Sequence, residues 1–526
     1  MKNKLFVFLL LVSGLVLSTA PSLWASSVVS EEIKFIAIQH NGRVKPLDAF
    51  ARQTLKIIAG RETWRKQPAI SVLFEALSHP DKIANLEWIR IDYFELKNSL
   101  GLPVEKTFFS LNELSSSLPK IQNLVRASKA KRDQDVRPTK LEQKAEQLLT
   151  QTRTVDNLIS GEALRLLPPQ GDNGEWLSPF SENKLSAGNF SKNIETALKN
   201  NKNLPPPLKT KLALEVWYYK LRPFECAAVF YFLGFLGFAL FERKKALLRL
   251  GIFFIFAALS FHTLGIGLRV YILSRPPVSN MYESMIFMNW ALMVYASFFA
   301  VVRKNSLAIA TGSIISALVM IYANLLPIDS SLDVLVPVLR SNYWLTIHVM
   351  TIVSSYGAFG LAMALGHRHL FAASFGKLDK KSEEDSASLI FRVIQLGTLL
   401  IGTGTFLGGV WANESWGRFW GWDPKETWAL ITFLGYLIIV HLKYAKKIND
   451  FYLALSAVVG FLLVLMTWYG VNFVLGRGLH SYGAGSGGMR WVVYYLIFEG
   501  LFVSLIIYRS FGSLQKESRP ASTRRK

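Results

Sequence analysis

The sequence predicts an all-α polytopic membrane protein, with about nine C-terminal transmembrane helices that follow an N-terminal external, mixed but mainly helical domain. Three observations predict this class. Hydrophobic residues make up 51% of the 526 residues. The apolar residues after position 222 gather in runs of about 20, which is the length that crosses a bilayer's hydrocarbon core. Basic residues fill every second connection between these runs, as the positive-inside rule requires.

The apolar runs define a membrane region at residues 223–510. They cover roughly residues 224–241, 249–272, 283–302, 307–325, 345–365, 390–410, 427–442, 453–475 and 490–508. If residues 27–222 lie outside the cytoplasm, the basic connections all fall on the cytoplasmic side, together with a basic cytoplasmic tail at residues 511–526. This agreement across the whole chain supports nine spans better than hydropathy alone.

The first 26 residues resemble a targeting segment. Lys2 and Lys4 are basic, and residues 5–20 are apolar. A cleaved signal peptide and a retained N-terminal anchor both fit this pattern. Either one places the domain at residues 27–222 outside the cytoplasm, and no catalytic motif in that domain indicates its role.

Charge and cysteine content exclude several classes. The formal net charge is +22, but many basic residues lie in short loops beside apolar runs, and no DNA- or RNA-binding motif is present. We therefore expect no nucleic-acid partner. The single cysteine, Cys226, cannot form an internal disulfide, a zinc cluster or a C-x-x-C pair. The chain also lacks the C-x-x-C-H site of a covalently bound haem.

An unusual stretch at residues 411–428, WANESWGRFWGWDPKETW, holds five tryptophans in a predicted external loop. Asp423-Pro424-Lys425-Glu426 also has the form of a helix start, with Asp as cap and Pro at the first helical position. Interfacial anchoring explains isolated tryptophans, but not so many rings in so few residues. The rings of Trp416, Trp420 and Trp422 suit a flat apolar ligand such as a porphyrin, since exposed apolar surface marks binding.

Two histidines are predicted at the level of this loop. His348 lies just inside the external end of the fifth run, and His480 lies just beyond the external end of the eighth. Lone membrane histidines are often packing residues, but two beside one aromatic platform favour function. Two neutral imidazoles can ligate one haem iron axially.

The other histidines are expected elsewhere. His441 lies at the cytoplasmic end of the seventh run, roughly 20 Å from the tryptophan stretch by the helical rise, and could hold half of a second, inner haem site. His262 is badly matched to it in depth, so we expect a packing or relay residue there. His367 and His369 lie in a predicted basic cytoplasmic loop and are expected to be interface residues.

The stretches GGVWANESWGRFWGWDPKETWALITF, YWLTIHVMTIVSSYGAF, YGVNFVLGRGLHSYG and LRVYILSRPPVSNMYES resemble CcsA (ResC), the System II cytochrome c biogenesis family of bacteria and chloroplasts. The resemblance covers about residues 260–485. CcsA is one of a wider superfamily of haem-handling proteins that share a WWD loop. The WDPKETW form with the later GLHSY is similar to CcsA rather than to CcmC or CcmF.

The resemblance implies a function and a site. His348 and His480 would be the external ligands of haem b held as substrate, with Trp416, Trp420, Trp422 and Asp423 beside it, and His441 would be the inner ligand. Haem would be presented at the outer face of a bacterial inner membrane and attached to an apocytochrome c with a C-x-x-C-H motif. The membrane partner CcsB (ResB) would supply the second inner ligand, and the two chains would form part of a holocytochrome c synthase.

Two other classes stay open at this point. A membrane electron-transfer subunit with b-type haem would need an intact electron-transfer chain and no apocytochrome. A solute transporter with histidine relays would favour inverted repeats with broken helices, and no clear repeat is visible. Lys425 and Arg490 are candidate contacts for haem propionates in the first interpretation.

Overall fold

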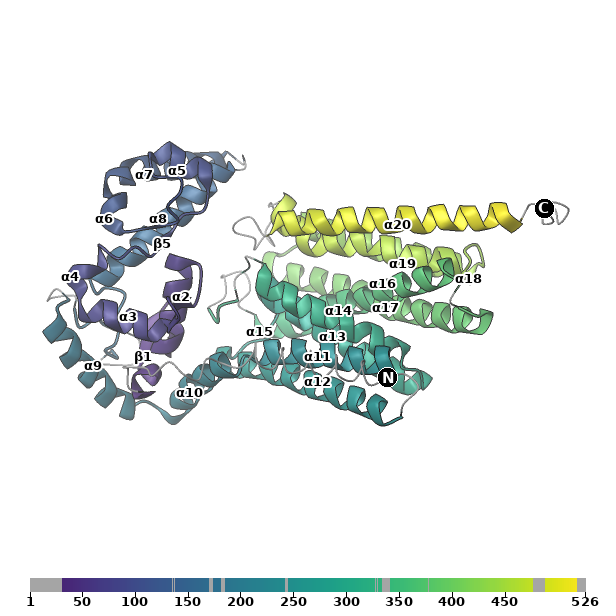
Figure 1. Cartoon of the computed structure of the whole chain (residues 1–526), viewed down its shortest axis with the longest axis horizontal. Coiled ribbons are helices and arrows are strands. Elements are labelled where there is room, and N and C mark those ends of the chain that lie inside the picture. Colours follow the sequence, from purple (N-terminus) through teal and green to yellow (C-terminus); the bar gives the residue numbers. More distant parts are fainter. Residues whose placement is uncertain are drawn as a thin grey trace.

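The computed structural model describes residues 31–134, 136, 138–169, 174–180, 185–241, 245–326, 328, 330–333, 341–376, 378–475 and 488–517. The predicted signal or anchor segment at residues 1–26, His480 and the tail residues 518–526 lie outside the described residues. The described part comprises an N-terminal region whose last helix ends at Lys202 and a bundle of long helices that begins at Pro206, and the two lie end to end (Figure 1).

The bundle contains nine helical stretches, within the described residues, that are long and apolar enough to cross a membrane, as predicted. Their elements are α10 (Pro206–Leu221) with α11 (Pro223–Phe241), α12 (Lys245–Leu273), α13 (Met281–Arg303), α14 (Leu307–Leu325), α15 (Asn342–Trp344) with the π-helical η4 (Leu345–Val349) and α16 (Met350–Ser374), α17 (Lys380–Trp416), α18 (Pro424–Tyr444), α19 (Asp450–Leu465) with the π-helical η5 (Met466–Leu475), and α20 (Met489–Glu517). The chain is thus a polytopic, mainly α-helical membrane protein.

The span bounds differ most from prediction at α16 and α17. Both helices continue well beyond their apolar runs, because polar residues can extend a helix where no breaker stops them. Asp379 caps α17 by accepting a hydrogen bond from the Ser382 amide at 2.9 Å, and Gly417 ends it in the left-handed conformation. The prediction that His367 and His369 lie in a loop is therefore wrong, since both lie in the last turns of α16.

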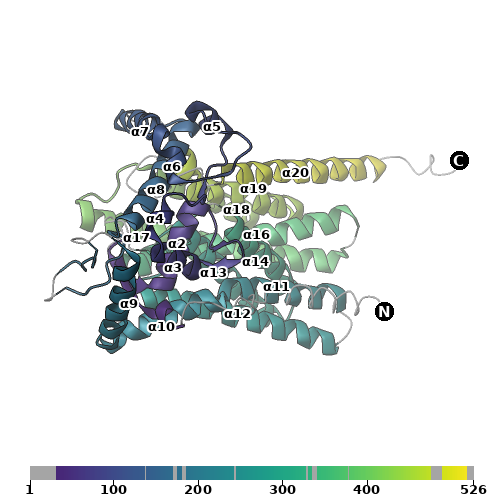
Figure 2. The ribbon, with the colours of Figure 1, turned by 60° about the vertical axis from the view of Figure 1, so that its left-hand side comes forward.

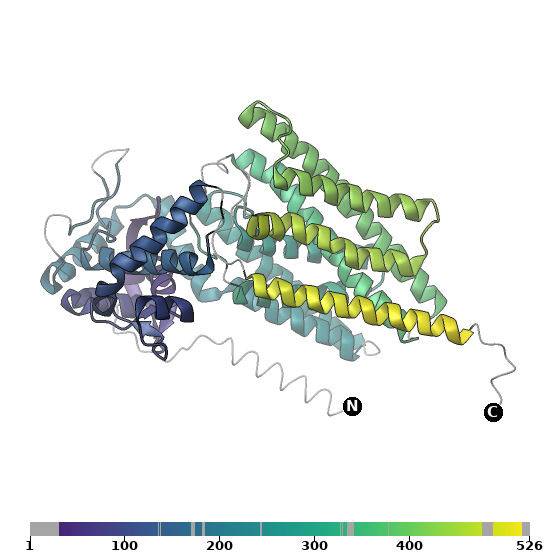
Figure 3. The same ribbon diagram turned by 90° about the horizontal axis from the view of Figure 1, so that it is seen from above.

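The spans pack around α16. In the most apolar segment of this span, 72% of the residues are buried, and α16 contacts α13, α14, α17, α19 and α20. By contrast, only 11% of the most apolar segment of α20 is buried, which places this helix at the edge of the bundle (Figure 3). A central helix is held by neighbours on every side, so residues on α16 have well-defined positions.

The N-terminal region is mainly helical with three small two-stranded sheets. Its elements are η1 (Glu31–Phe35), β1 (Ala37–His40), β2 (Arg43–Pro46), α2 (Leu47–Ala59), β3 (Thr63–Trp64), β4 (Gln67–Pro68), α3 (Ala69–Ser78), α4 (Pro80–Ile83), β5 (Ile89–Arg90), α5 (Phe94–Leu100), β6 (Phe108–Phe109), α6 (Leu111–Leu114), η2 (Ser115–Ser117), α7 (Leu118–Asp133), α8 (Lys140–Ile159) and α9 (Ala187–Lys202). β1 and β2 form a hairpin because Asn41 and Gly42, with φ of 51° and 75°, suit a two-residue turn.

The N-terminal region rests on the end of the bundle (Figure 2). Lys45 Nζ lies 2.6 Å from Asp333 Oδ1, in the connection after α14, and the lysine is fully buried. Arg43 forms an ion pair with Glu215 and donates to the carbonyl of Leu332. These contacts join the β hairpin to the bundle, and we call this end of the bundle its domain-side end.

The connection after α14 is also hydrogen-bonded to residues inside the bundle. Arg269 donates to the carbonyl oxygens of Ser330 at 3.1 Å and Ser331 at 2.9 Å. Its guanidinium also pairs with the fully buried Glu283 at 2.8 Å, which Arg275 approaches at 2.7 Å. Buried charges require partners of this kind. The connection at residues 330–333 therefore links the N-terminal region to α12 and α13.

Candidate functional site

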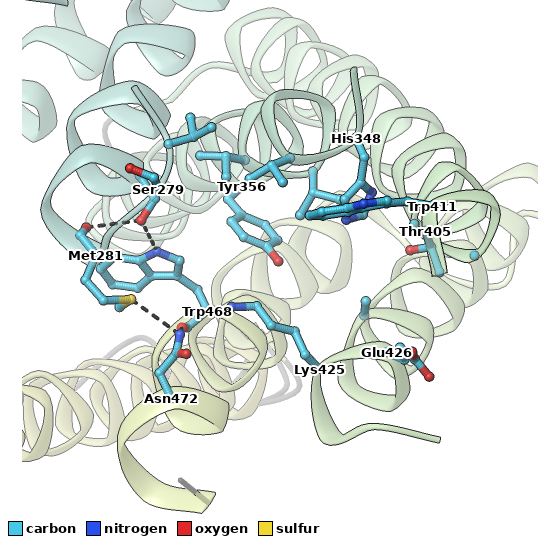
Figure 4. A pocket seen from close by; sticks show the side chains of 18 of the residues that line it. Ser279, Met281, His348, Tyr356, Thr405, Trp411, Lys425, Glu426, Trp468 and Asn472 are labelled. Atoms are coloured by element: carbon cyan, nitrogen blue, oxygen red, sulfur yellow. Dashed lines mark hydrogen bonds between the residues drawn. The ribbon is translucent and has the colours of Figure 1, made fainter. Parts of the chain in front are cut away.

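A cavity lies at the domain-side end of the bundle, between five spans (Figure 4). It contains about 940 Å³ of empty space, counting the part that is open to solvent. Its walls come from the segments around α13, η4–α16, α17, α18 and η5. The lining residues are mostly apolar or aromatic, and the described ones are Val278, Ser279, Asn280, Met281, Ser284, His348, Val349, Ile352, Val353, Tyr356, Thr405, Gly408, Gly409, Trp411, Trp420, Lys425, Glu426, Ala429, Trp468 and Asn472. Apolar walls with a few converging polar groups are typical of ligand sites.

His348 is held rigidly at this cavity. It lies in η4, a one-turn π-helical segment of the kind that is frequent at functional sites. Its Nδ1 atom is 2.8 Å from the carbonyl oxygen of Gly404. Because a carbonyl can only accept, Nδ1 donates, and the neutral ring then has its lone pair on Nε2. The ring also lies against Gly408, where a Cβ atom would come within 2.6 Å of His348 Cε1.

Trp411 packs beside this histidine. The two ring centroids are 5.7 Å apart, and Trp411 also stacks on Trp344 at 6.5 Å with an interplanar angle of 12°. Figure 4 shows Trp411 and His348 together on one wall of the cavity. The sequence interpretation placed Trp411 in an external loop, but the residue belongs to the last turns of α17 and is buried.

The remaining tryptophans of the stretch separate into different surroundings. Only residues 417–423 lie outside helices, because Trp416 is the last residue of α17 and Trp428 lies in α18. Trp420 lines the cavity, and its ring meets that of Trp422 edge to face at 6.0 Å. Trp422 is 71% exposed and has a φ of 57°. Of the three tryptophans that we proposed as haem contacts, Trp420 is the one that lines the described cavity.

Asp423 and Glu426 form the predicted helix start of α18. The Asp423 side chain accepts from the Lys425 amide at 2.9 Å, and Glu426 Oε2 accepts from the Asp423 amide at 3.2 Å and the Gly421 amide at 2.8 Å. Asp423 is 7% exposed. This capping box fixes the entry of the tryptophan stretch into α18, so Asp423 determines where Trp420 and Glu426 lie.

The two candidate propionate contacts lie in different places. Lys425 reaches across the cavity towards Trp468 and Asn472 (Figure 4). Arg490 lies at the start of α20, with its guanidinium carbon 5.6 Å from the centre of the Trp491 ring. Arg490 is not among the described residues that line the cavity. Lys425 is thus the better placed of the two.

The other two predicted ligands are His441, which is not at this cavity, and His480. His441 is exposed at the opposite end of α18, about 27 Å from Asp423 by helical rise, and its Nδ1 is 2.7 Å from the carbonyl of Leu437. His480 lies outside the described residues, so the proposed pair of external histidines remains a prediction. Among the predicted external histidines and the tryptophans of residues 411–428, the residues that the structure brings together are His348, Trp411 and Trp420.

The remaining bundle histidines have protein partners. Fully buried His262 has both ring nitrogens engaged, Nδ1 with the Tyr231 hydroxyl and Nε2 with the Ile286 carbonyl, each at 3.1 Å. Of the packing and relay roles that we expected for His262, this arrangement favours packing. His367 Nε2 contacts Glu499 Oε2 at 3.0 Å and so joins α16 to α20, the span to which sequence analysis assigned no role. His369 Nδ1 lies 3.2 Å from the Ser386 hydroxyl of α17.

Several lining residues were missed by sequence reasoning. Tyr356 lies eight residues after His348, which returns it to a similar face of the helix, and Trp468 and Asn472 are four residues apart in the eighth span. That spacing could have identified Tyr356, because an apolar face with one hydroxyl below a histidine is visible in the sequence. Ser284 could not have been found in this way, since it is placed by the 2.9 Å bond that it accepts from Trp468 Nε1.

The fold and this cavity define a polytopic membrane protein with a histidine and tryptophan site at one end of its bundle. Residues 278–480 match the family described as cytochrome C assembly protein. The cytochrome c biogenesis protein CcsA of Panax ginseng is 33% identical over 250 residues, which are 40% of this chain and 78% of that protein. CcsA of Prochlorococcus marinus (strain NATL2A) is 35% identical over 243 residues, 39% of this chain and 76% of that protein. The chain belongs to this cytochrome c assembly family.

A longer relative matches most of the chain. Protein NrfI of Wolinella succinogenes is 30% identical over 500 residues, which are 85% of this chain and 53% of NrfI. The match therefore extends into the N-terminal region, beyond the part shared with the CcsA proteins. The chain spans about half the length of NrfI.

Proposed function

We propose that this protein holds haem b at the domain-side end of its bundle and promotes covalent attachment of that haem to apocytochrome c. The observation that carries the proposal is the position of His348. Its Nδ1–H is fixed on Gly404, and its ring shares a cavity with Trp411 and Trp420 in a chain of the cytochrome c assembly family. A histidine oriented by a backbone carbonyl is the usual form of an iron ligand.

In this proposal His348 and His480 ligate the haem iron, and the tryptophan rings cover the porphyrin. Lys425, which lines the cavity, would contact a propionate. An apocytochrome would then offer its C-x-x-C-H segment, whose thiols add to the haem vinyl groups while its histidine replaces one ligand. The protein's part is to hold the reactants in position, and such positioning can supply a large part of a rate enhancement.

The cytoplasmic part of the proposal rests on His441. Its exposed position on α18 leaves the ring open to a ligand from outside this chain, since its Nδ1 contacts only its own helix among the described residues. We propose that His441 is one ligand of an inner haem site and that a CcsB (ResB) chain or segment provides the other. Haem would pass from this site to the cavity at the domain-side end.

We further propose that the domain-side end faces the periplasm of a bacterial inner membrane. The basic connections among the described residues lie at the end of the bundle opposite to the N-terminal region. This position suits the cytoplasm. Among them are Arg303–Lys304 and Lys443, which pairs with Asp450 at 2.5 Å. Cysteine labelling of intact cells at Thr107 and at Lys446 would test this orientation.

The experiment is co-expression with CcsB and an apocytochrome, scored by covalent haem staining and by the haem spectrum of the purified protein. His348→Ala and His480→Ala should each abolish maturation and lower bound haem, whereas His79→Ala, at an exposed position of the N-terminal region, should change neither. Full maturation without either cavity histidine would defeat the proposal. Bound haem without any requirement for apocytochrome would favour an electron-transfer subunit.

A further inference from the structure

Two buried polar atoms at the cavity lack a hydrogen-bond partner among the described residues. They are Glu426 Oε1, an acceptor when the carboxylate is ionised, and Trp420 Nε1, a donor. Both residues line the cavity, from the start of α18 and the stretch before it. Native proteins leave few such atoms unpaired, and those that remain are often at functional sites.

The two oxygens of Glu426 have different surroundings. Oε2 accepts the amides of Gly421 and Asp423 and thereby completes the capping box. Oε1 takes no part in that cap, and no donor in the described residues reaches it. A glutamine would preserve the cap with its amide oxygen, so the cap alone does not require a carboxylate. The second oxygen is suited to a donor that a ligand brings.

We propose that Glu426 is the base that accepts the thiol proton when a cysteine of apocytochrome c adds to haem. This inference rests on the proposed function. The proton leaves sulfur for Glu426 Oε1, and the thiolate forms a C–S bond with one vinyl carbon as the vinyl double bond opens. The other vinyl carbon receives the proton back from the Glu426 carboxyl group. The addition needs no oxidant or reductant, and Glu426 returns to its starting state.

The other titratable groups around the cavity are less suited to this step. His348 faces it from η4, but the lone pair of its ring is assigned to iron. Tyr356 comes from α16 and Lys425 from α18, and each has a much higher ordinary pKa than a carboxyl group. The described parts of α13, α17 and η5 that line the cavity contribute no titratable side chain. Asp423 is engaged at the helix cap, and Arg418 lies over the Trp416 ring.

The test compares Glu426→Gln with the wild-type protein, each purified with CcsB and haem. Attachment of a C-x-x-C-H peptide is measured from pH 6.5 to 9.5. Glu426→Gln should retain haem but slow attachment at pH 7 by roughly 10²–10⁴-fold, the usual contribution of general base catalysis. The defect should shrink as pH rises through about 8.5, where free thiols ionise without help.

A matched control is Glu225→Gln. Glu225 also lies in the first turn of a span, α11, but it is 40% exposed, pairs with Arg222 and does not line the cavity. This variant should attach haem at the wild-type rate at every pH. Wild-type attachment by Glu426→Gln at pH 7, or a slowing of equal size at all pH values, would overturn the inference.

A selenocysteine peptide distinguishes base catalysis from a change in structure. Because a selenol is already ionised at pH 7, Glu426→Gln should attach this peptide at close to the wild-type rate. If Glu426→Gln does not retain haem, the comparison of thiol and selenol peptides is made on the wild-type protein alone. Similar rates for thiol and selenol peptides at pH 7 would support an internal base, and a large preference for selenol would contradict it. A wild-type protein that binds no haem would instead refute the proposed function.

Discussion

His348 and Gly404 are joined across two spans by a 2.8 Å contact from a ring nitrogen to a backbone carbonyl. One turn further along α17, Gly408 lies beneath the same ring, where a methyl group would come within 2.6 Å of it. The carbonyl orients the imidazole and the absent side chain makes room for it. Helix α17 therefore determines the position of His348 as much as its own helix does.

Gly408→Ala should displace the His348 ring from this position. A Cβ atom at 2.6 Å is closer than packing allows, so the ring must move and its contact with Gly404 must lengthen. We expect at least a tenfold loss of bound haem, measured from the absorbance of the purified protein. Gly500→Ala, where nothing lies within 4 Å, is the control and should bind haem normally. Normal haem content in Gly408→Ala would contradict this role for α17.

His262→Ala should destabilise the bundle without a specific effect on haem. The change leaves the Tyr231 hydroxyl and the Ile286 carbonyl buried without their partner, at about 1–3 kcal/mol for each group. The expected result is a lower midpoint of thermal unfolding in detergent, with unchanged haem per folded molecule. His262→Asn can restore part of the hydrogen bonding and should be intermediate. A stable His262→Ala protein that lacks haem would show that this histidine does more than pack.

Asp333→Asn should loosen the N-terminal region from the bundle. Lys45 is fully buried and would lose the carboxylate that pairs with it, so that only neutral acceptors such as Gln53 Oε1, at 2.6 Å, would remain beside its ammonium group. We expect a cost of about 3 kcal/mol, the lower end of the range for a broken buried pair, because Asp333 is 27% exposed. The measurement is the denaturant concentration at which protease begins to cleave within residues 31–222.

The control for this prediction is the exposed pair Arg165 and Glu175, whose side chains are 43% and 79% exposed. Glu175→Gln should cost less than about 1 kcal/mol. Replacing Lys45 by methionine together with Asp333→Asn should recover part of the loss, since no unpaired ammonium then stays buried. Equal protease resistance in all of these variants would exclude an ionic link between the two parts of the chain.

The N-terminal region should lose stability as the pH falls from about 6.5 to about 4. Burial, with a further contribution from Lys45, lowers the pKa of His40 from 6.5 to about 4. Between these values the unfolded chain binds a proton that the folded chain does not, so acid favours unfolding and the stability is fully present above pH 6.5.

Removing this titration should flatten the pH dependence. His40→Gln should show a smaller change in unfolding midpoint between pH 7 and pH 4.5 than the wild-type protein, as measured by near-ultraviolet circular dichroism. His79→Gln, at an exposed position in the same region, should follow the wild-type curve. A His40→Gln curve as steep as that of the wild-type protein would assign the acid sensitivity to other groups.

The membrane helices were predictable from sequence because each span needs its own apolar run. The helix start at Asp423 was equally predictable, since capping depends on neighbours along the chain. The extra turns of α16 and α17 were not, because polar residues can continue a helix without changing the apolar pattern. This is why His369, predicted in a loop, is instead buried against Ser386.

The site was predictable only at the level of residue types. Five tryptophans in one stretch indicated a ring-binding surface, but their individual roles depend on where α17 ends. Trp411 lies inside the helix and faces His348, whereas Trp422 follows it and points to solvent. Glu426 Oε1, which has no hydrogen-bond partner among the described residues, was also beyond sequence reasoning, because its surroundings depend on the packing of five spans.

The bond between Lys45 and Asp333 joins residues 288 positions apart in the chain. At common rates of translation, the ribosome makes the second residue roughly 15–60 s after the first. In the orientation that we propose, four hydrophobic segments must enter the bilayer during that interval before the loop with Asp333 can reach the far side. The N-terminal region therefore cannot complete its contacts until these spans are inserted. Only a chain whose spans have inserted in the correct orientation can pair the buried Lys45 with Asp333.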